Sequence, residues 1–297
     1  MASEALQQII DATPADFPEV TDHLMVRARM APLHGRPTQP STRIEFVEMG
    51  GIRCAWVSAK EVQPGAPTLF FCHGGAFVSC NLDAYLFYAE LISRQLQAPV
   101  LTVDYRLAPE HRYPAALDDC FAAYRGLLAS GQDPARLICI GDSCGGGLAI
   151  AVLYRARDAG LPMPAGVVSL CGWLVLDTSG YAPEYTSSRD PFVSVGWVLT
   201  TSRAYVGPGG DLTDPYVSPG HGDPTGLPPL LLQVGEVDVN RRDTEAFALR
   251  ARMTGVLATL DLTAGSVHGF QGIESVPEAV EAWGRAAAFV ARCTAKG

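Results

Sequence analysis

The sequence predicts an α/β protein built on one mostly parallel, eight-stranded sheet flanked by helices. Short apolar runs typical of fully buried strands recur from residue 68 onward, and stretches with helical periodicity separate them. This alternation indicates parallel strands whose connecting helices cover both faces of the sheet. The chain has 297 residues, of which 48% are hydrophobic, which is enough to bury one large core.

The expected strands begin with an antiparallel hairpin, in which RIEFVEM and IRCAWV flank the turn residues Gly50 and Gly51. The buried strands that follow are TLFFC, VLTVDY, RLICIG, AGVVSLC and LLLQVG, and a run at 256–262 completes the eight. Helices are expected between these strands, at 85–96, 115–128, 145–159, 242–254 and 277–291.

Two segments interrupt this alternation. The N-terminal segment contains two helical stretches before any strand, and 187–205 adds another helical stretch between two strands. Because such insertions commonly form a lid or a substrate wall, we expect a helical cap made of 1–42 and 180–206. The rest of the single domain, 43–179 and 207–297, forms the catalytic core. Apolar side chains of the cap either line an acyl pocket or pack the cap on the core; they include Phe17, Leu24, Met25, Met30, Trp197 and Tyr205.

Charge and hydropathy exclude several kinds of partner. The net charge is −9 and no Lys/Arg-rich stretch occurs, which argues against nucleic-acid binding. The N-terminal MASEALQQII lacks the positive charge of a signal peptide. No apolar run approaches the ~20 residues that span a membrane. We therefore expect a soluble, cytoplasmic protein that acts on a small molecule.

The cysteines and histidines predict neither disulfides nor a metal site. The eight cysteines form no CxxC pair, and the six histidines show no HxH or HxxxH spacing. A chain of this length also does not need disulfides for stability. Reduced cysteines and no metal are the expectation.

A candidate nucleophile lies in the motif Gly141-Asp142-Ser143-Cys144-Gly145, which matches G-x-S-x-G between a predicted strand and a predicted helix. In that context the serine sits on a sharp turn that exposes its Oγ at the sheet edge. The glycines allow strand and helix to approach closely. Ser143 is therefore the candidate nucleophile, and the N–H of Cys144 is a candidate oxyanion donor. The Cys144 thiol is an alternative nucleophile, but no base accompanies it.

A glycine-rich loop follows the strand TLFFC, in the order His73-Gly74-Gly75-Ala76-Phe77. Consecutive glycines leave the backbone free to turn its N–H groups toward a substrate carbonyl. The alternative is an ordinary glycine turn at a strand end. Together with the serine motif, the loop is better interpreted as an oxyanion-binding loop.

Four stretches, HGGAF, VDYRLAPEHRYPAALDD, GDSCGG and HGF, resemble the hormone-sensitive-lipase-like esterases, the bacterial family IV of the α/β-hydrolase superfamily. The resemblance covers about residues 45–297. It implies a capped, eight-stranded α/β-hydrolase fold, hydrolysis of short-chain acyl esters without a cofactor, and a homodimer formed through edge strands. It also implies that Gly74 and Gly75 donate to the oxyanion with Cys144, and that Ser143 is the nucleophile.

The acid and the base are sought after the serine, because an α/β-hydrolase triad runs Ser, Asp or Glu, His in chain order. Asp238 follows the predicted strand LLLQVG, where a carboxylate can accept the imidazole Nδ1–H. Glu236 and Asp243 are alternatives, and the family pattern favours Asp238. His268, in GSVHGF, is the one histidine after it. The predicted triad is Ser143, His268 and Asp238.

Four positions depart from the family pattern. Ala76 stands where many members have a third glycine, and Cys144 where most have alanine, so both side chains are expected to crowd the acyl site slightly. Asn240 and Arg242 replace two residues of the usual Asp-x-Leu-x-Asp segment after the acid. These two replacements leave the contacts of that loop open.

The predicted function is hydrolysis of short-chain carboxylic esters through an acyl-enzyme on Ser143. Candidate substrate contacts are Phe77, Trp173, Trp197 and Tyr205, and the few large apolar residues of the cap favour short acyl chains. Lactones, carbamates and amides are alternative substrates. A lyase or a receptor of the same fold is an alternative function, although such receptors lose the histidine that His268 supplies.

Overall fold

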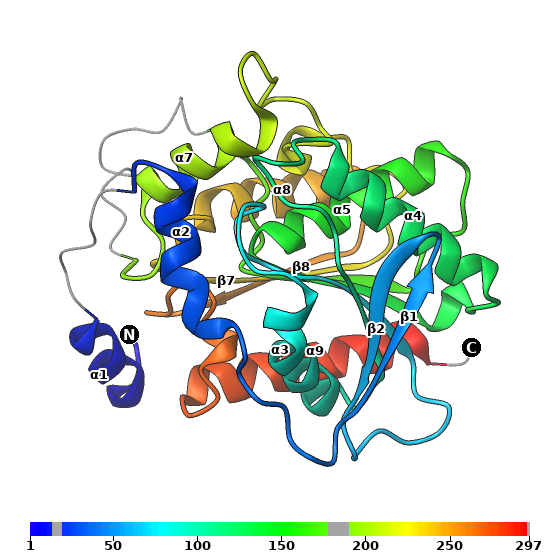
Figure 1. The fold of residues 1–297 in the computed structure, drawn as a ribbon. Helices are drawn as coiled ribbons and strands as arrows, with labels where there is room; N and C mark the ends of the chain where they lie inside the picture. Colours follow the sequence, from blue (N-terminus) through cyan, green and yellow to red (C-terminus); the bar gives the residue numbers. More distant parts are fainter. Residues whose placement is uncertain (14–19, 178–189, 296–297) are drawn as a thin grey trace.

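A computed structural model describes residues 1–13, 20–177 and 190–295 (Figure 1). Phe17 and part of the predicted cap segment 180–206 therefore lie outside the described residues. The strands are β1 (Arg43–Met49), β2 (Ile52–Ser58), β3 (Thr68–Cys72), β4 (Val100–Val103), β5 (Leu137–Asp142), β6 (Gly166–Leu170), β7 (Leu230–Gly235) and β8 (Ala258–Thr263). The α-helices are α1 (Glu4–Ala12), α2 (His23–Met30), α3 (Leu82–Leu96), α4 (Ala115–Ala129), α5 (Cys144–Asp158), α7 (Val195–Val206), α8 (Arg241–Met253) and α9 (Pro277–Thr294).

Within the described residues the strands form one sheet of eight, in the order β1-β2-β4-β3-β5-β6-β7-β8. β1 and β2 pair antiparallel, with Met49 opposite Ile52 across the Gly50-Gly51 turn. β2 also runs antiparallel to β4, whereas every later pair of neighbours is parallel. The predicted α/β fold with a mostly parallel, eight-stranded sheet is confirmed.

Helices cover both faces of the sheet. Successive residues of a strand point to opposite faces, so each strand contributes side chains to two cores. In β3, Phe70 and Cys72 belong to the core on the side of α4, α5 and α8. Leu69 and Phe71 belong to the core on the side of α3 and α9. Figure 1 shows α4, α5 and α8 above the sheet and α3 and α9 below it. Because both faces of the sheet are covered, all residues of β3 are buried, which explains its continuous apolar sequence.

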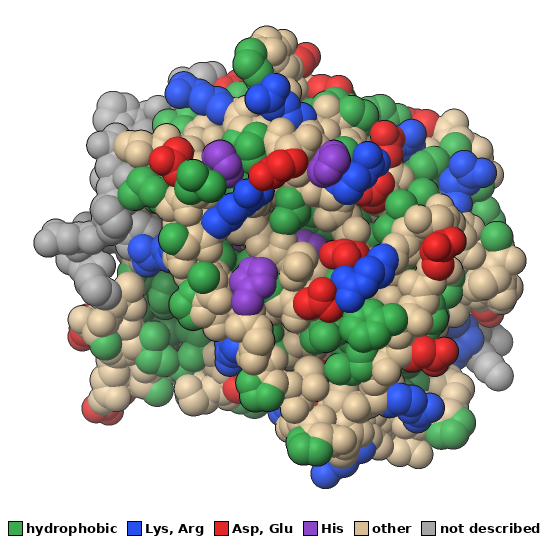
Figure 2. Space-filling model, in the orientation of Figure 1, with side chains coloured by type: hydrophobic (Ala, Val, Ile, Leu, Met, Phe, Trp, Pro, Cys, Tyr) green, Lys and Arg blue, Asp and Glu red, His purple; other side chains and the backbone are tan. Residues whose placement is uncertain are grey.

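The five helices expected between the strands agree with the observed ones except near their ends, whereas the described part of the expected stretch 187–205 is helical only from Val195. α3 begins at Leu82 and not at 85, because the Asn81 side chain accepts the Ala84 N–H at 2.9 Å and caps the helix there. No described helix is long and apolar enough to cross a membrane. On the face shown in Figure 2, acidic and basic side chains are interspersed, with hydrophobic side chains between them. All eight cysteines are free, and all but Cys293 are buried.

The two N-terminal helices occupy different places. α2 contacts α7, and Oγ1 of Thr200 in α7 donates to the carbonyl of Val20 at 2.7 Å. These helices lie side by side in Figure 1. α1 instead packs beside α9, where Leu6 is buried and Ser3 Oγ donates to Glu278 Oε2 at 2.9 Å. The division of the chain into cap and core stays a prediction, and α2 and α7 are the helices that bear on it.

Candidate active site

Ser143 lies on the sharp turn between β5 and α5, with φ 54° and ψ −123°. This backbone conformation is unusual for a residue with a side chain, and the Ser143 N–H stabilises it by donating to Leu170 O at 2.9 Å. A Cβ on Gly141 would lie 2.1 Å from the carbonyl oxygen of Gly145, and one on Gly145 would lie 2.0 Å from that of Cys72. The glycines are therefore required where strand and helix meet.

His268 and Asp238 come from the loops after β8 and β7. Nε2 of His268 is 2.9 Å from Ser143 Oγ, and Nδ1 is 3.1 Å from both carboxylate oxygens of Asp238. The Asp238 side chain is fully buried, and that of His268 is 10% exposed. The structure thus brings together the three residues predicted to form a triad. In this geometry Nε2 can accept the Ser143 proton while Asp238 holds Nδ1–H.

Three carboxylates act on the ionisation of His268. Burial lowers its pKa, but the charges of Asp238, Asp190 and Asp142 and the hydrogen bond to Asp238 outweigh burial, so the pKa rises to about 9. Burial raises the pKa of Asp142 to about 6. It also raises the pKa of Asp190 to about 6, with the Asp238 charge adding to the effect. The site therefore favours the imidazolium that forms when His268 takes a proton.

Asp142, the residue before Ser143, is buried beneath the glycine-rich loop. The Tyr85 hydroxyl of α3 donates to Asp142 Oδ2 at 2.9 Å. A Cβ on Gly74 would lie 2.5 Å from that oxygen and 2.6 Å from the Tyr85 hydroxyl. Gly74 therefore allows the loop to pack directly on this pair. The motif G-x-S-x-G leaves the Asp142 position open, so no role for it was predictable from the motif.

The glycine-rich loop after β3 contains consecutive left-handed residues, with φ of 113° at Gly75, 55° at Ala76 and 63° at Phe77. A Cβ on Gly75 would lie 2.1 Å from the carbonyl oxygen of Ser79, so this position requires glycine. Gly75 and Ala76 line the cavity beside Ser143, and Gly74 packs on Asp142 and Tyr85, which line it too. The assignment of Gly74, Gly75 and Cys144 as oxyanion donors stays a prediction.

His73 fixes the start of this loop. Its ring stacks on Tyr105 with centroids 4.1 Å apart, and the Tyr105 hydroxyl donates to His73 O at 2.7 Å. Burial lowers the pKa of His73 to about 4, so the ring is neutral near pH 7. Its Nδ1 lies 2.7 Å from the carbonyl oxygen of Gly74 and donates to it. The buried, neutral histidine thus orients the loop.

The Cys144 thiol faces the loop. Phe77 N–H donates to Sγ at 3.3 Å, and the Cys144 side chain is fully buried. Burial raises the pKa of the thiol to about 12, so it is protonated near neutral pH and is a poor nucleophile. Of the two side chains expected to crowd the acyl site, Ala76 lines the cavity and Cys144 does not.

A cavity of about 440 Å³ opens onto Ser143 and His268, a size that suits a small-molecule ligand. Met30 at the end of α2 and Trp197 of α7 line it, together with Phe192 from the segment that precedes α7. Of the described helices in the expected cap segments, α2 and α7 therefore supply part of the wall and α1 does not. Leu24 of α2, in contrast, is exposed.

The four predicted substrate contacts separate into two pairs. Trp173 and Trp197 line the cavity. Phe77 and Tyr205 are buried and do not line it; their rings stack with centroids 3.9 Å apart. Phe77 also packs on Trp173, with centroids 6.1 Å apart. Direct substrate contact of all four stays a prediction.

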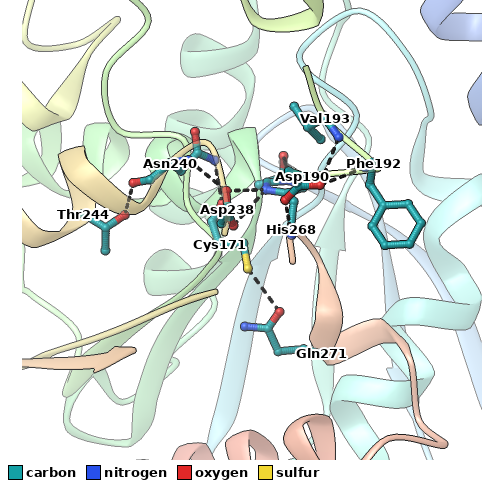
Figure 3. Close-up of polar contacts among 10 residues, drawn as sticks. Cys171, Asp190, Phe192, Val193, Asp238, Asn240, Thr244, His268 and Gln271 are labelled. Atoms are coloured by element: carbon teal, nitrogen blue, oxygen red, sulfur yellow. Dashed lines mark hydrogen bonds and ion pairs between the residues drawn. The ribbon is translucent and has the colours of Figure 1, made fainter. Parts of the chain in front are cut away.

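Asn240, one of the departures from the family pattern, holds the loop that carries the acid. Its backbone N–H donates to Asp238 Oδ1 at 2.8 Å, and its Nδ2 donates to Cys171 O at 3.0 Å (Figure 3). Asn240 thereby ties the Asp238 loop to the chain just after β6. Arg242, the other departure in this loop, is exposed on α8.

Two residues that sequence reasoning did not single out connect the expected cap segments to the site. Arg27 of α2 donates from Nε to Val78 O at 2.7 Å and pairs with Glu110 at 2.6 Å. Asp190 accepts the backbone N–H of His268 at 2.6 Å. The backbone groups they bind are 51 and 78 positions away in the chain. Contacts at such separations leave no local sequence signal.

Within the described residues, the one group of side chains arranged closely enough to hold a metal is Cys171, Asp238 and His268. Burial raises the pKa of Cys171 well above its usual value, and its Sγ donates to Gln271 Oε1 at 3.3 Å. A protonated thiol is a poor ligand, and Asp238 and His268 bind each other. Asp238 and His268 fit a hydrogen-bonded acid and base better than two ligands of a metal.

Comparison with known proteins agrees with this geometry. A family model described as an alpha/beta hydrolase fold matches residues 69–272. An acetyl-hydrolase of Streptomyces hygroscopicus is 34% identical over 254 residues, which cover 85% of this chain and 84% of the relative. The carboxylesterase NlhH of Mycobacterium tuberculosis is 32% identical over 305 residues, covering 97% and 94% of the two chains.

Solved structures give the same result. The esterase EstE5, soaked with p-nitrophenyl butyrate, has a TM-score of 0.88 at 32% identity, with 98% of each chain covered. An esterase of the bacterial hormone-sensitive lipase family has a TM-score of 0.86 at 31% identity, covering 99% of this chain and 100% of the other. The chain therefore belongs to the α/β-hydrolase fold family. Within this fold family, the chain is a hormone-sensitive-lipase-like esterase. Its enzyme class is serine carboxylesterase, as the sequence predicted.

Proposed function

We propose that this protein hydrolyses esters of short-chain carboxylic acids through an acyl-enzyme formed on Ser143. One observation carries the proposal: a continuous hydrogen-bonded chain runs from Ser143 Oγ through His268 to Asp238, and it opens onto a cavity. A hydroxyl aligned with a base whose other nitrogen is held by a buried carboxylate is the arrangement that activates serine for acyl transfer.

The first half-reaction forms the acyl-enzyme. Nε2 of His268 takes the Ser143 proton as Oγ bonds to the ester carbonyl carbon, and the carbonyl π electrons move onto its oxygen. The N–H groups of Gly74, Gly75 and Cys144 stabilise this oxyanion, and each such donor is worth about 3 kcal/mol. The carbonyl then re-forms, the bond to the alkoxy oxygen breaks, and His268 passes its proton to the departing alcohol.

The second half-reaction releases the acid. His268 takes a proton from water as the water oxygen attacks the acyl carbon, and a second oxyanion forms at the same N–H groups. Its collapse breaks the bond to Ser143 Oγ, which recovers a proton from His268. Asp238 remains ionised throughout and holds Nδ1–H.

A preference for short acyl chains is supported by the size of the site. The cavity of about 440 Å³ must hold both the acyl and the alcohol part of the substrate, and Trp173 and Trp197 line it. α2 and α7 would form the cap that closes it, and Arg27 of α2 donates to Val78 O, just after the glycine-rich loop. The relative from Streptomyces hygroscopicus is an acetyl-hydrolase, which supports small acyl groups.

The test is a series of p-nitrophenyl esters, from acetyl through butanoyl and octanoyl to hexadecanoyl, given to the wild type and to Ser143→Ala. We expect turnover of the wild type to be highest on acetyl or butanoyl esters, and that of the variant to fall ~10⁴-fold or more. Mass analysis of the products must show addition of water. Equal rates on butanoyl and hexadecanoyl esters would contradict the short-chain preference, and a product formed by elimination would indicate a lyase.

A further inference from the structure

Asp190 occupies a central place beside the site, although no sequence motif marks it. Its side chain is buried and lies next to His268 and Asp238 (Figure 3). It belongs to the segment that precedes α7, and Phe192 and Val193, two and three residues further along that segment, line the cavity. Asp190 is thus placed where the cavity wall and the loop of the base meet.

Both carboxylate oxygens of Asp190 face N–H groups. Oδ2 accepts the backbone N–H of His268 at 2.6 Å. Oδ1 accepts the backbone N–H groups of Phe192 and Val193, at 2.8 and 3.2 Å. An amide would place its NH2 group against one of these donors. The contacts therefore favour the ionised carboxylate, which also gives the strongest hydrogen bonds.

The two sets of contacts connect parts of the molecule that are far apart in sequence. Through Oδ1, Asp190 fixes the turn that places Phe192 and Val193 in the cavity wall. Through Oδ2, it fixes the backbone of His268, whose Nε2 must stay within reach of Ser143 Oγ at 2.9 Å. One carboxylate therefore joins the cavity wall to the backbone of the base.

The charge of Asp190 also acts on the imidazole. The groups that influence His268 electrostatically are Asp238, Asp190 and Asp142, and all raise its pKa. Asp238 holds Nδ1 directly, and Asp142 lies before the nucleophile. Asp190 is the one of these carboxylates that binds the backbone of the base.

We infer that Asp190 is a positioning residue that locks the cavity wall formed by Phe192 and Val193 to the backbone of His268, and that its negative charge helps to stabilise the imidazolium. The inference rests on the proposed function, in which His268 is the base. One carboxylate, that of Asp190, then both positions the base and holds part of the wall of the acyl pocket.

The experiment compares Asp190→Ala and Asp190→Asn with the wild type in the full chain. Asp190→Ala removes both sets of hydrogen bonds and the charge, whereas Asp190→Asn keeps one acceptor and removes the charge. We expect kcat/KM on p-nitrophenyl butanoate, compared on the plateau above the His268 pKa, to fall about 100-fold in the alanine variant and about 10-fold in the asparagine variant. The ratio of rates on butanoyl and octanoyl esters should change with Asp190→Ala, because Phe192 and Val193 lose their anchor.

A second readout does not depend on catalysis. The imidazole pKa of His268, followed by NMR titration of histidine-labelled protein, should be lower in both Asp190 variants than in the wild type. The matched control is Asp22→Ala. Asp22 is exposed and caps α2 by accepting the N–H groups of Leu24 and Met25 at 2.8 and 3.0 Å, far from His268 in the chain. This control should leave the His268 pKa unchanged and kcat/KM within about threefold of the wild type.

Each outcome decides between explanations. Wild-type kcat/KM and an unchanged His268 pKa in both Asp190 variants would overturn the inference. An equal shift of the pKa in Asp22→Ala would also overturn it, since general loosening of the cap would then explain the effect. If Ser143→Ala retained full hydrolysis, the proposed function would fail, while the titration would still show whether Asp190 acts on His268. The asparagine variant keeps the question answerable if Asp190→Ala does not fold.

Discussion

The site has two sides, the turn that carries Ser143 and the loops that carry His268 and Asp238, and different interactions hold each side in place. Around Ser143 the backbone itself sets the geometry, through close contacts at Gly141 and Gly145 and a positive φ at the nucleophile. Around His268 the geometry comes from side chains, because Asp238 binds the imidazole and Asp190 binds the main chain of the same residue.

This difference decides how each side responds to change. A side held by close backbone contacts has no room for an added methyl group, so substitution there is expected to cost stability. A side held by charged hydrogen bonds can keep its fold while it loses proton transfer, so substitution there is expected to cost activity and to change the pH profile.

The largest effect is expected on the His268 side, from Asp238→Asn. An amide cannot stabilise the imidazolium and favours the wrong tautomer, so kcat should fall about 10⁴-fold. Steady-state kinetics on p-nitrophenyl butanoate measure it. Glu236→Gln is the matched control, because Glu236 is a neighbouring acid on the same loop and accepts the Gly265 N–H at 2.7 Å. A larger loss in the Glu236 variant would transfer the role of the acid to Glu236.

On the Ser143 side, Gly145→Ala is expected to destabilise the fold. Its Cβ would lie 2.0 Å from the carbonyl oxygen of Cys72, so strand and helix must separate. The free energy of unfolding in denaturant should fall by roughly 3 kcal/mol. Gly284→Ala, in α9, is the control, since nothing lies within 4 Å of its added Cβ and alanine favours a helix interior by about 1 kcal/mol. Equal stability of the two variants would contradict the account of the turn.

The pH dependence tests the charges around His268. Because the neutral imidazole is the base and its pKa is raised to about 9, neutral His268 increases as the pH rises toward that value. Below it, kcat/KM should rise about tenfold per pH unit, measured with an ester whose spontaneous hydrolysis is subtracted. A plateau that begins near pH 7 would show that the carboxylates do not raise the pKa of His268.

A smaller effect is expected from Cys144→Ala, which restores the residue typical of the family. The thiol accepts the Phe77 N–H at 3.3 Å but does not line the cavity. Loss of this weak hydrogen bond should reduce kcat/KM by about threefold or less. A loss comparable to that of Asp238→Asn would mean that the thiol takes part in the chemistry.

The smallest effect on activity is expected from substitutions that prevent formation of a homodimer. The resemblance to the family implies a homodimer formed through edge strands, and the edge strand β8 is flanked by Leu257, which is 74% exposed, and contains Leu262, which is 38% exposed. Size-exclusion chromatography with light scattering should show a dimer for the wild type. It should show a monomer for Leu257→Asp combined with Leu262→Arg, with activity per chain nearly unchanged. A monomeric wild type would contradict the dimer.

The sequence made the Ser143 side predictable and the His268 side predictable only in part. Glycines at fixed spacing around Ser143 mark a close backbone contact, and a single histidine after Asp238 left one candidate for the base. Asp190 carries no such mark, because its importance arises from a contact with His268 that forms only when the chain folds.

The substrate wall shows the same limit. Aromatic residues near the site were recognisable, but periodicity does not distinguish a ring that lines a cavity from one that packs behind it. Trp173 and Trp197 line the cavity, whereas Phe77 and Tyr205 stack on each other. Separating the two pairs requires the relative positions of the loop after β3 and of α7.

The central claim, that Ser143 carries the acyl group, is tested most directly by mass spectrometry of the enzyme after reaction with diethyl p-nitrophenyl phosphate, which traps the nucleophile. We expect one diethylphosphoryl group per chain, on the peptide that contains Ser143, and none in Ser143→Ala. A label on Cys144 or any other residue, or full hydrolytic activity in a completely labelled enzyme, would contradict the acyl-enzyme mechanism.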